Sequence, residues 1–321
     1  MGLPFARRLA APPRLMLPKA VDLRRLEPRY VFVVAFYHAV ALLALWPALF
    51  SWTGVVLAVA GVYVFAGFGI NLCYHRLLTH RGLVLPRRLE HAFALCGLIC
   101  MQDSPARWVA VHRLHHQHAD RQEDPHSPLA GFFWGHVGWM LVKNHDLSRL
   151  GIYERYARDI LRDPFYKRME RPGFHAAVLL GSWLAFLLGG FVTGLLMGWG
   201  LAGAVQFGAS LLVWGVFVRT VLAWHITWSV NSLAHLWGYR NYETGEDSRN
   251  NWFVALLTSG EGWHNNHHAD PRAVRHGHRW WELDPIFWVI RGLEAVGLAR
   301  DVVRPRAQTR EPQLERKETQ A

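Results

Sequence analysis

Charge is missing from two long stretches of this sequence. Residues 31–74 contain no aspartate, glutamate, lysine or arginine, and neither do residues 174–218. About 20 apolar residues cross the core of a bilayer, so each stretch is long enough for two helices. Glycine or proline interrupts each stretch near its middle. We therefore predict an all-α integral membrane protein with four spans in two hairpins, near residues 31–50, 53–73, 176–196 and 202–222.

Cysteine is also scarce. Cys73, Cys96 and Cys100 form no Cys-x-x-Cys pair and lie in or beside apolar segments, so we expect buried, reduced thiols. The sequence has no cysteine-rich iron–sulfur segment and no Gly-x-Gly-x-x-Gly nucleotide fingerprint. Any electrons that the protein uses must therefore come from a separate donor.

The charge distribution predicts an orientation. The chain carries 35 lysines and arginines against 24 acidic residues, and basic residues gather before the first and third predicted spans. A hairpin returns the chain to the side it left, so the N-terminus, residues 75–172 and the segment after Arg219 should share one side. The positive charge marks that side as cytoplasmic, and we expect both termini there. A net charge of +11 would attract anionic lipid or an acidic protein, and we expect no nucleic-acid partner.

The two ends of the chain differ from the region between them. Residues 1–30 are basic but have no apolar core, which excludes a cleavable signal peptide and favours a segment on the membrane surface. Residues 303–321 are polar, which predicts a disordered tail. Residues 31–302 remain as one domain.

Nineteen histidines are present, and nine of them cluster on the predicted cytoplasmic side. The clusters are His75-x4-His80, His112-x2-His115-His116, Asn231-x3-His235 and His264-x2-His267-His268. Positions i, i+3 and i+4 share one face of an α-helix, so each His-x-x-His-His should present three imidazoles together. His75 and His80 diverge by about 140° on a regular α-helix and should straddle a helix end.

The clusters predict a metal site. Neutral imidazole suits iron, zinc, copper and nickel, and nine imidazoles are too many for one ion, so we expect two metals. Asp120, Asp124 and His126 are candidates to orient the ligands from behind, because a metal-bound histidine usually donates its second N–H to an acceptor. Isolated histidines are more often structural. Those placed outside the ligand set are His38, His91, His118, His136, His145, His175, His225, His276 and His278.

The histidine clusters and the short motifs next to them resemble those of the membrane fatty-acyl desaturases of the stearoyl-CoA type. The resemblance extends over about residues 30–302. The matching motifs beside the histidine clusters are Asp124-Pro125-His126, Gly131-Phe132-Phe133-Trp134, His136-Val137-Gly138-Trp139, Ala234-His235-Leu236-Trp237-Gly238-Tyr239 and Gly260-Glu261-Gly262-Trp263-His264. This resemblance implies four membrane helices with a cytosolic helical cap. It also implies two irons held by the nine clustered histidines, with Asn231 holding one iron through a water.

The implied reaction removes two hydrogens from adjacent methylenes of a saturated acyl chain, at C9–C10, and consumes O2 and two electrons. The implied donor is a ferredoxin or a cytochrome b5-like protein. In the animal enzymes an Arg-Asp pair that contacts coenzyme A precedes the second histidine cluster, but here Ala110 and Val111 occupy these places. The sequence is more similar to the bacterial, cyanobacterial and plant branch, so the acyl carrier is either coenzyme A or a glycerolipid.

The second span leads into the first histidine cluster and should line an acyl tunnel. Steps of four residues back from His75 give Asn71, Gly67 and Tyr63 on roughly one face. At 1.5 Å per residue, Tyr63 would lie about 18 Å from His75 along the axis. We predict that its ring forms the floor of the tunnel, where the resemblance also implies a bulky residue; the alternative is an ordinary interhelical tyrosine.

Three other functions could use some of these residues. A haem-b carrier would need facing histidines across the membrane, and His38 with His175 is the available pair. A metal transporter would need ionisable residues inside its spans, which the two uncharged stretches disfavour. A related histidine-rich di-iron hydroxylase would use the same clusters and insert oxygen instead of removing hydrogen, so it remains an alternative at this stage.

Overall fold

The computed structural model describes residues 15–306. The start of the basic N-terminal segment and nearly all of the predicted C-terminal tail lie outside these residues. The described elements are β1 (Val21–Leu26), α1 (Pro28–Ala41), η1 (Leu42–Leu45), η2 (Pro47–Leu49), α2 (Trp52–Gly61), η3 (Val62–Thr79), α3 (Arg87–Ile99), α4 (Pro105–His118), η4 (Pro128–Ala130), η5 (Trp134–Gly138), α5 (Trp139–Leu141), β2 (Val142–Asn144), η6 (His145–Leu147), α6 (Arg149–Tyr156), η7 (Ile160–Arg162), α7 (Pro164–Met169), α8 (Pro172–Leu196), α9 (Gly200–Leu212), η8 (Val213–Val218), α10 (Arg219–Leu236), α11 (Trp252–Leu257), α12 (His264–Ala269) and α13 (Pro285–Ala295).

Four helices are long and apolar enough to cross a membrane, as predicted. They cover Pro28–Leu45, Trp52–Thr79, Pro172–Leu196 and Gly200–Leu236. The second and fourth continue well past the predicted ends at residues 73 and 222. This extension has a structural consequence, because it carries the first histidine cluster and the Asn231–His235 pair on rigid helices.

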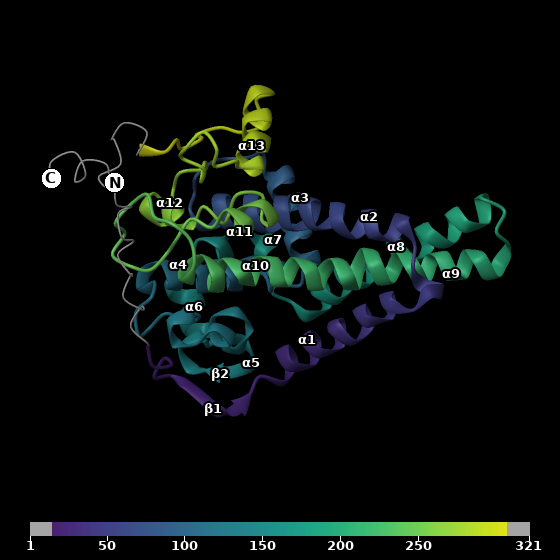
Figure 1. The fold of residues 1–321 in the computed structure, drawn as a ribbon, viewed down its shortest axis with the longest axis horizontal. Helices are drawn as coiled ribbons and strands as arrows, with labels where there is room; N and C mark the ends of the chain where they lie inside the picture. Colours follow the sequence, from purple (N-terminus) through teal and green to yellow (C-terminus); the bar gives the residue numbers. More distant parts are fainter. Residues whose placement is uncertain (1–14, 307–321) are drawn as a thin grey trace, which may run out of the picture.

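The four long helices differ in how deeply they are buried. In the most apolar part of the first and third, only 11% and 6% of residues are buried, whereas the second and fourth reach 50% and 44%. Figure 1 shows the long helices running from a region of short helices towards the turn between α8 and α9. The second and fourth helices thus form the centre of the bundle, while α1 and α8 keep apolar faces outward.

Glycines allow α8 and α9 to approach each other closely. A Cβ atom on Gly190 would lie 2.8 Å from the Cα of Gly208, and one on Gly194 would lie 2.6 Å from the Cα of Ala204. Such distances leave no room for a side chain. At the other turn, Ser51 caps α2 by accepting a hydrogen bond from the Gly54 backbone N–H at 3.0 Å.

The chain is mostly α-helical, as predicted, and one small two-stranded sheet accompanies the helices in the described residues. β1 pairs antiparallel with β2, with Val21 opposite Asn144 and Asp22 opposite Lys143. Part of the basic segment expected on the membrane surface is therefore a strand tied to the short-helix region. The pairing joins residues more than 100 positions apart and its strands are short, so sequence periodicity did not reveal it.

Candidate metal centre

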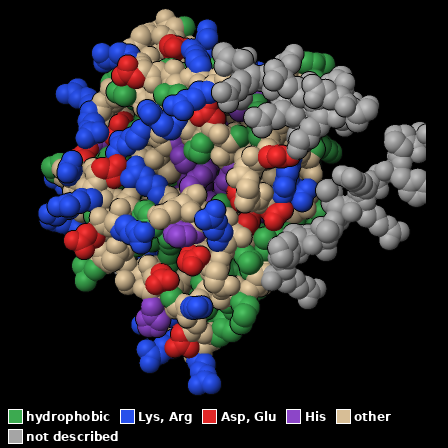
Figure 2. Space-filling model, turned by 90° about the vertical axis from the view of Figure 1, so that its left-hand side faces the viewer, with side chains coloured by type: hydrophobic (Ala, Val, Ile, Leu, Met, Phe, Trp, Pro, Cys, Tyr) green, Lys and Arg blue, Asp and Glu red, His purple; other side chains and the backbone are tan. Residues whose placement is uncertain are grey.

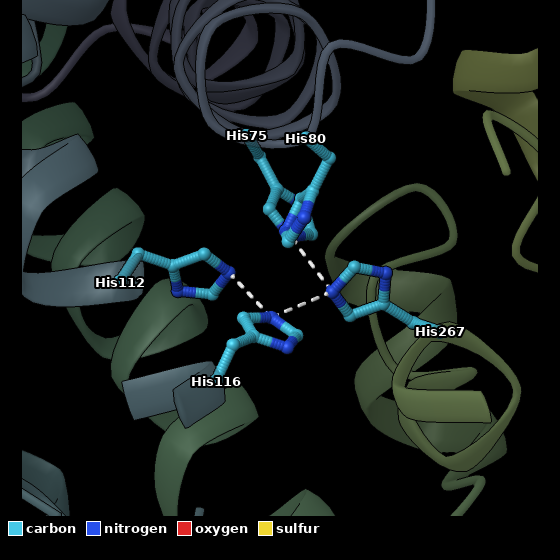
Figure 3. Close-up of side chains that lie close together, drawn as sticks. All are labelled: His75, His80, His112, His116 and His267. Carbon is cyan, nitrogen blue, oxygen red and sulfur yellow. Dashed lines mark hydrogen bonds between the residues drawn. The ribbon is translucent and has the colours of Figure 1, made fainter. Parts of the chain in front are cut away.

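Five histidines form the first group: His75, His80, His112, His116 and His267. They come from η3, its C-terminal end, α4 and α12, and Figure 3 shows the rings turned towards one another. The His116 Nε2 lies 3.0 Å from both the His112 Nε2 and the His267 Nε2, and the His267 Nε2 lies 3.0 Å from the His75 Nε2. A single N–H cannot satisfy so many converging nitrogens, whereas a cation among them would.

The shape of η3 brings His75 and His80 together. We expected these residues to diverge on an α-helix, but η3 is a π-helix, in which the backbone hydrogen bond joins residues five apart. The His80 N–H donates to the His75 carbonyl at 3.2 Å. The ring centroids are consequently only 4.8 Å apart, and His80 caps the helix, which agrees with the expected helix end.

Four histidines form the second group: His115, His235, His264 and His268. They come from α4, α10 and α12, and the Nε2 atoms of His264 and His268 lie 3.1 Å apart. The two groups adjoin, since the rings of His116 and His268 stack with centroids 4.5 Å apart. All nine clustered histidines are thus brought together, and the structure divides them into sets of five and four, which the sequence did not.

Burial keeps several of these rings neutral. It lowers the pKa of His112, His116 and His267 well below that of a free imidazole, and neighbouring imidazoles lower it further. The buried Nε2 atoms of His80 and His235 have no hydrogen-bond partner among residues 15–306. Neutral imidazoles with inward, unpaired nitrogens fit a transition-metal ion, and the adjoining groups fit two.

Carboxylates support the rings from behind. Glu261 accepts from the His75 Nδ1 at 2.6 Å, Asp120 accepts from the His235 Nδ1 at 2.7 Å, and Asp124 lies 3.0 Å from the His115 Nδ1. Each contact fixes the tautomer that leaves Nε2 free to face a metal.

These carboxylates remain ionised despite their burial. Burial alone would raise the pKa of Asp120 and Asp124, but His235 and His115 respectively lower each below its usual value. The predicted third supporting residue, His126, stacks on His115 with centroids 4.5 Å apart. Burial, followed by His115, lowers the pKa of His126 to about 3.

Comparison with known proteins agrees with this geometry. Residues 50–302 match the profile of the fatty acid desaturase family. The chain is 40% identical to the sn-1 stearoyl-lipid 9-desaturase of Anabaena variabilis, over 83% of this chain and 89% of the relative. It is 41% identical to the sn-2 palmitoyl-lipid 9-desaturase of Nostoc, over 86% and 90%, and 40% identical to an acyl-CoA C20 Delta5-desaturase of Anemone leveillei, over 89% and 86%.

The chain belongs to the fatty acid desaturase family. It is therefore an oxidoreductase that desaturates fatty acyl chains, and its two histidine groups fit the iron dependence that is general in this family. Figure 2 shows histidines at one face of the desaturase, surrounded by lysines and arginines as well as by acidic side chains.

Two cavities of the desaturase meet beside the histidines. The larger, of about 450 Å³, extends towards α1 and β2, and the narrower, of about 50 Å³, extends along η3. Four residues line both: Trp108, His112, Thr227 and Asn231. The predicted tunnel residues Tyr63, Gly67 and Asn71 all line the narrower cavity.

A buried ionic network that the sequence patterns did not predict lies behind the first group. Arg76 donates to Glu261 at 2.8 Å and to Asp284 at 3.0 Å, and these three side chains are at most 6% exposed. His276, placed outside the ligand set, lies with its Nδ1 3.2 Å from Glu261. The sequence feature that could have predicted this network is the position of Glu261, three residues before His264.

The desaturase also joins three histidines outside the metal centre. The His38 Nε2 lies 3.0 Å from the His225 Nε2, and the His225 Nδ1 lies 3.0 Å from the His136 Nε2. His38 thus pairs with His225 and not with His175, the partner considered for a haem carrier. The three cysteines form no disulfide, and burial raises the pKa of Cys100 to about 12, as expected for a reduced thiol.

Proposed function

We propose that this desaturase introduces a cis double bond at C9–C10 of a saturated long-chain acyl group. The observation that carries the proposal is that the two cavities share four lining residues, one of which is His112 of the first histidine group. An acyl chain threaded through both cavities would have a methylene pair beside the metal centre, with its carboxyl end in the larger cavity. The 9-desaturases among the relatives support the position.

The nine clustered histidines would hold two irons, and Asn231 would hold one of them through a water. When bound, the irons supply the O2 chemistry that removes the two hydrogens. The protein supplies the placement: Trp108 and Thr227 border the shared section, so they would restrict how the chain passes the metals. Asp120, Asp124 and Glu261 would hold the imidazoles in one orientation.

The carrier that we propose is a glycerolipid. Ala110 and Val111 are 0% and 7% exposed, so these positions offer no polar group to a coenzyme A head. The larger cavity is bordered by Arg29, Arg107 and Lys143, which suit a polar or anionic lipid head group. Relatives named for stearoyl-lipid and palmitoyl-lipid activity are consistent with this choice.

A side-by-side assay of stearoyl-CoA and stearoyl-phospholipid, with a reconstituted electron donor, would test the carrier. We expect the phospholipid to be desaturated at least as well as the CoA ester. A strong preference for the CoA ester would reject the glycerolipid.

Electrons would come from an acidic ferredoxin or a cytochrome b5-like protein. Many lysines and arginines lie on the face in Figure 2 where histidines are visible, so a negatively charged donor would be drawn there. This docking requires that the face lies in the cytoplasm, with both termini on the same side of a bacterial inner membrane. The basic segments before the first and third spans support that orientation.

Expression in a host that lacks unsaturated fatty acids would test the function. Mass spectrometry of the lipids should show acyl chains that have lost two hydrogens, with the double bond at C9–C10. The His115→Ala variant, with one iron ligand removed, should give no product. Chains that gain one oxygen instead would support the hydroxylase alternative, and a double bond elsewhere would reject the C9–C10 position.

A further inference from the structure

The narrower cavity changes character along its length. Its inner end is polar and includes Asn71, His75 and Asn231, whereas its outer end is formed by Val62, Tyr63 and Ile226. The inner end is fixed, because the Asn71 amide donates to the Thr258 carbonyl at 2.7 Å. A hydrocarbon tail would favour the apolar end.

The outer end reaches the surface of the protein. Tyr63 lines the cavity, yet 43% of this residue is exposed. Its neighbour Val64 is exposed to the same extent. Both residues lie on a helix that is apolar enough to cross a membrane, so this surface faces lipid. Tyr63 therefore lies between the cavity and the lipid-facing surface, and its ring is part of the boundary that separates them.

No polar contact in the described part of the chain holds the Tyr63 ring. Among the hydrogen bonds of residues 15–306, none involves its hydroxyl group. A Cβ atom on nearby Gly67 would lie 3.3 Å from the Ile286 Cδ1, which is the tip of a flexible side chain, and no other atom would lie within 4 Å. The ring can therefore move aside without breaking a polar contact or displacing backbone.

We propose that the acyl tunnel opens sideways into the bilayer at its methyl end, between Tyr63 of η3, Ile226 of α10 and Leu257 of α11. Tyr63 acts as a movable rim and not as a floor. This inference rests on the proposed acyl path. Carbons beyond the opening would lie in lipid, where extra methylenes neither gain nor lose contact with the protein, so chain length is not measured at this end.

The test uses the full-length enzyme in phospholipid vesicles with its electron donor, and phospholipids carrying saturated chains of sixteen to twenty-two carbons. An open tunnel predicts C9 desaturation rates that vary little across the series. A closed tunnel predicts a fall of about tenfold or more beyond one length, the cost of overpacking an apolar site. A sharp length limit that Tyr63→Ala relieves would overturn the proposal.

A bulky substitution at the proposed opening provides a second test. Ile226→Trp should create a length limit that the wild-type enzyme lacks. The matched control is Leu222→Trp, one turn earlier on α10, because Leu222 is 40% exposed and does not line the cavity. If both variants keep the flat wild-type profile, the opening is not at Ile226 and the proposal fails.

A measurement without variants covers the case in which Ile226→Trp does not fold. A substrate with a photoreactive group at the methyl end of a twenty-two-carbon chain should label vesicle phospholipids when bound to the enzyme. Labelling of protein alone would overturn the proposal. Absence of any C9 desaturation in the wild-type enzyme would instead reject the proposed function, so the two failures are distinguishable.

Discussion

The two histidine groups lie side by side but are supported differently. The first group has five imidazoles and one supporting carboxylate, Glu261, whose charge is balanced by Arg76. The second group has four imidazoles and three nearby carboxylates. These are Asp124 beside His115, Asp120 beside His235, and Glu246 at 3.7 Å from the His268 Nδ1.

This difference shows two ways of stabilising a cation in a buried site. The first group uses more neutral ligands, and its surrounding charges largely cancel. The second group has fewer imidazoles but more uncompensated negative charge behind them. We therefore expect the two metals to differ in affinity and in reduction potential, although both groups are mainly imidazole.

The largest effect should come from the ionic network of the first group. Arg76→Met leaves Glu261 and Asp284 buried without their cation, which should lower the free energy of unfolding by about 3–5 kcal/mol. Thermal unfolding in detergent measures the loss. Arg291→Met is the control, because its pair with Glu294 is 3.6 Å apart and largely exposed, and such a pair contributes about 1 kcal/mol or less. Equal losses in both variants would contradict the account.

A smaller effect is expected from the carboxylates that contact the second group. Asp124→Asn removes the negative charge next to His115 and should weaken iron binding in this group by about 10- to 100-fold. Competition with a chelator, followed by iron analysis, measures the release. Glu123→Gln, a change at an exposed neighbour, should leave it unchanged. Simultaneous release of both irons from the Asp124 variant would show that the two groups are not independent.

Acidification should destabilise the protein through His126. Burial lowers the pKa of this ring to about 3, whereas an exposed imidazole in the unfolded chain has a pKa of 6.5, so the unfolded state binds more protons at pH values between the two. Stability is therefore lost as the pH falls below about 6.5, by about 1.4 kcal/mol per unit for this one group. Unfolding measured against pH should show a shallower slope for His126→Gln. An unchanged slope would mean that His126 does not contribute.

The smallest expected effect concerns reduction potential. Negative charge stabilises the ferric form, so the iron of the first group should accept an electron before that of the second. Stepwise reduction followed by Mössbauer spectroscopy resolves the order. Glu246→Gln should decrease the difference in reduction potential between the two irons. If the iron of the second group is reduced first, the expected order of the two potentials is wrong.

Sequence patterns predicted the parts that depend on local spacing. The uncharged stretches indicated four spans, and the i, i+3, i+4 spacing indicated that His112, His115 and His116 act together. What the sequence did not show depends on long-range contacts or unusual backbone. The π-helix that aligns His75 with His80, the pairing of β1 with β2 and the contact of Glu261 with Arg76 are of this kind. The division of the histidines into five and four likewise needed the packing of α4 against α10 and α12.

The central claim is that the nine histidines hold two irons in two distinct groups. Iron analysis with Mössbauer spectroscopy of the wild type, His267→Ala and His235→Ala tests it most directly. We predict two irons per wild-type chain in two environments, with His267→Ala losing mainly the signal of the first group and His235→Ala mainly that of the second. Both variants should insert into the membrane and have no desaturase activity. A single environment in the wild type, or full iron content in either variant, would contradict the account.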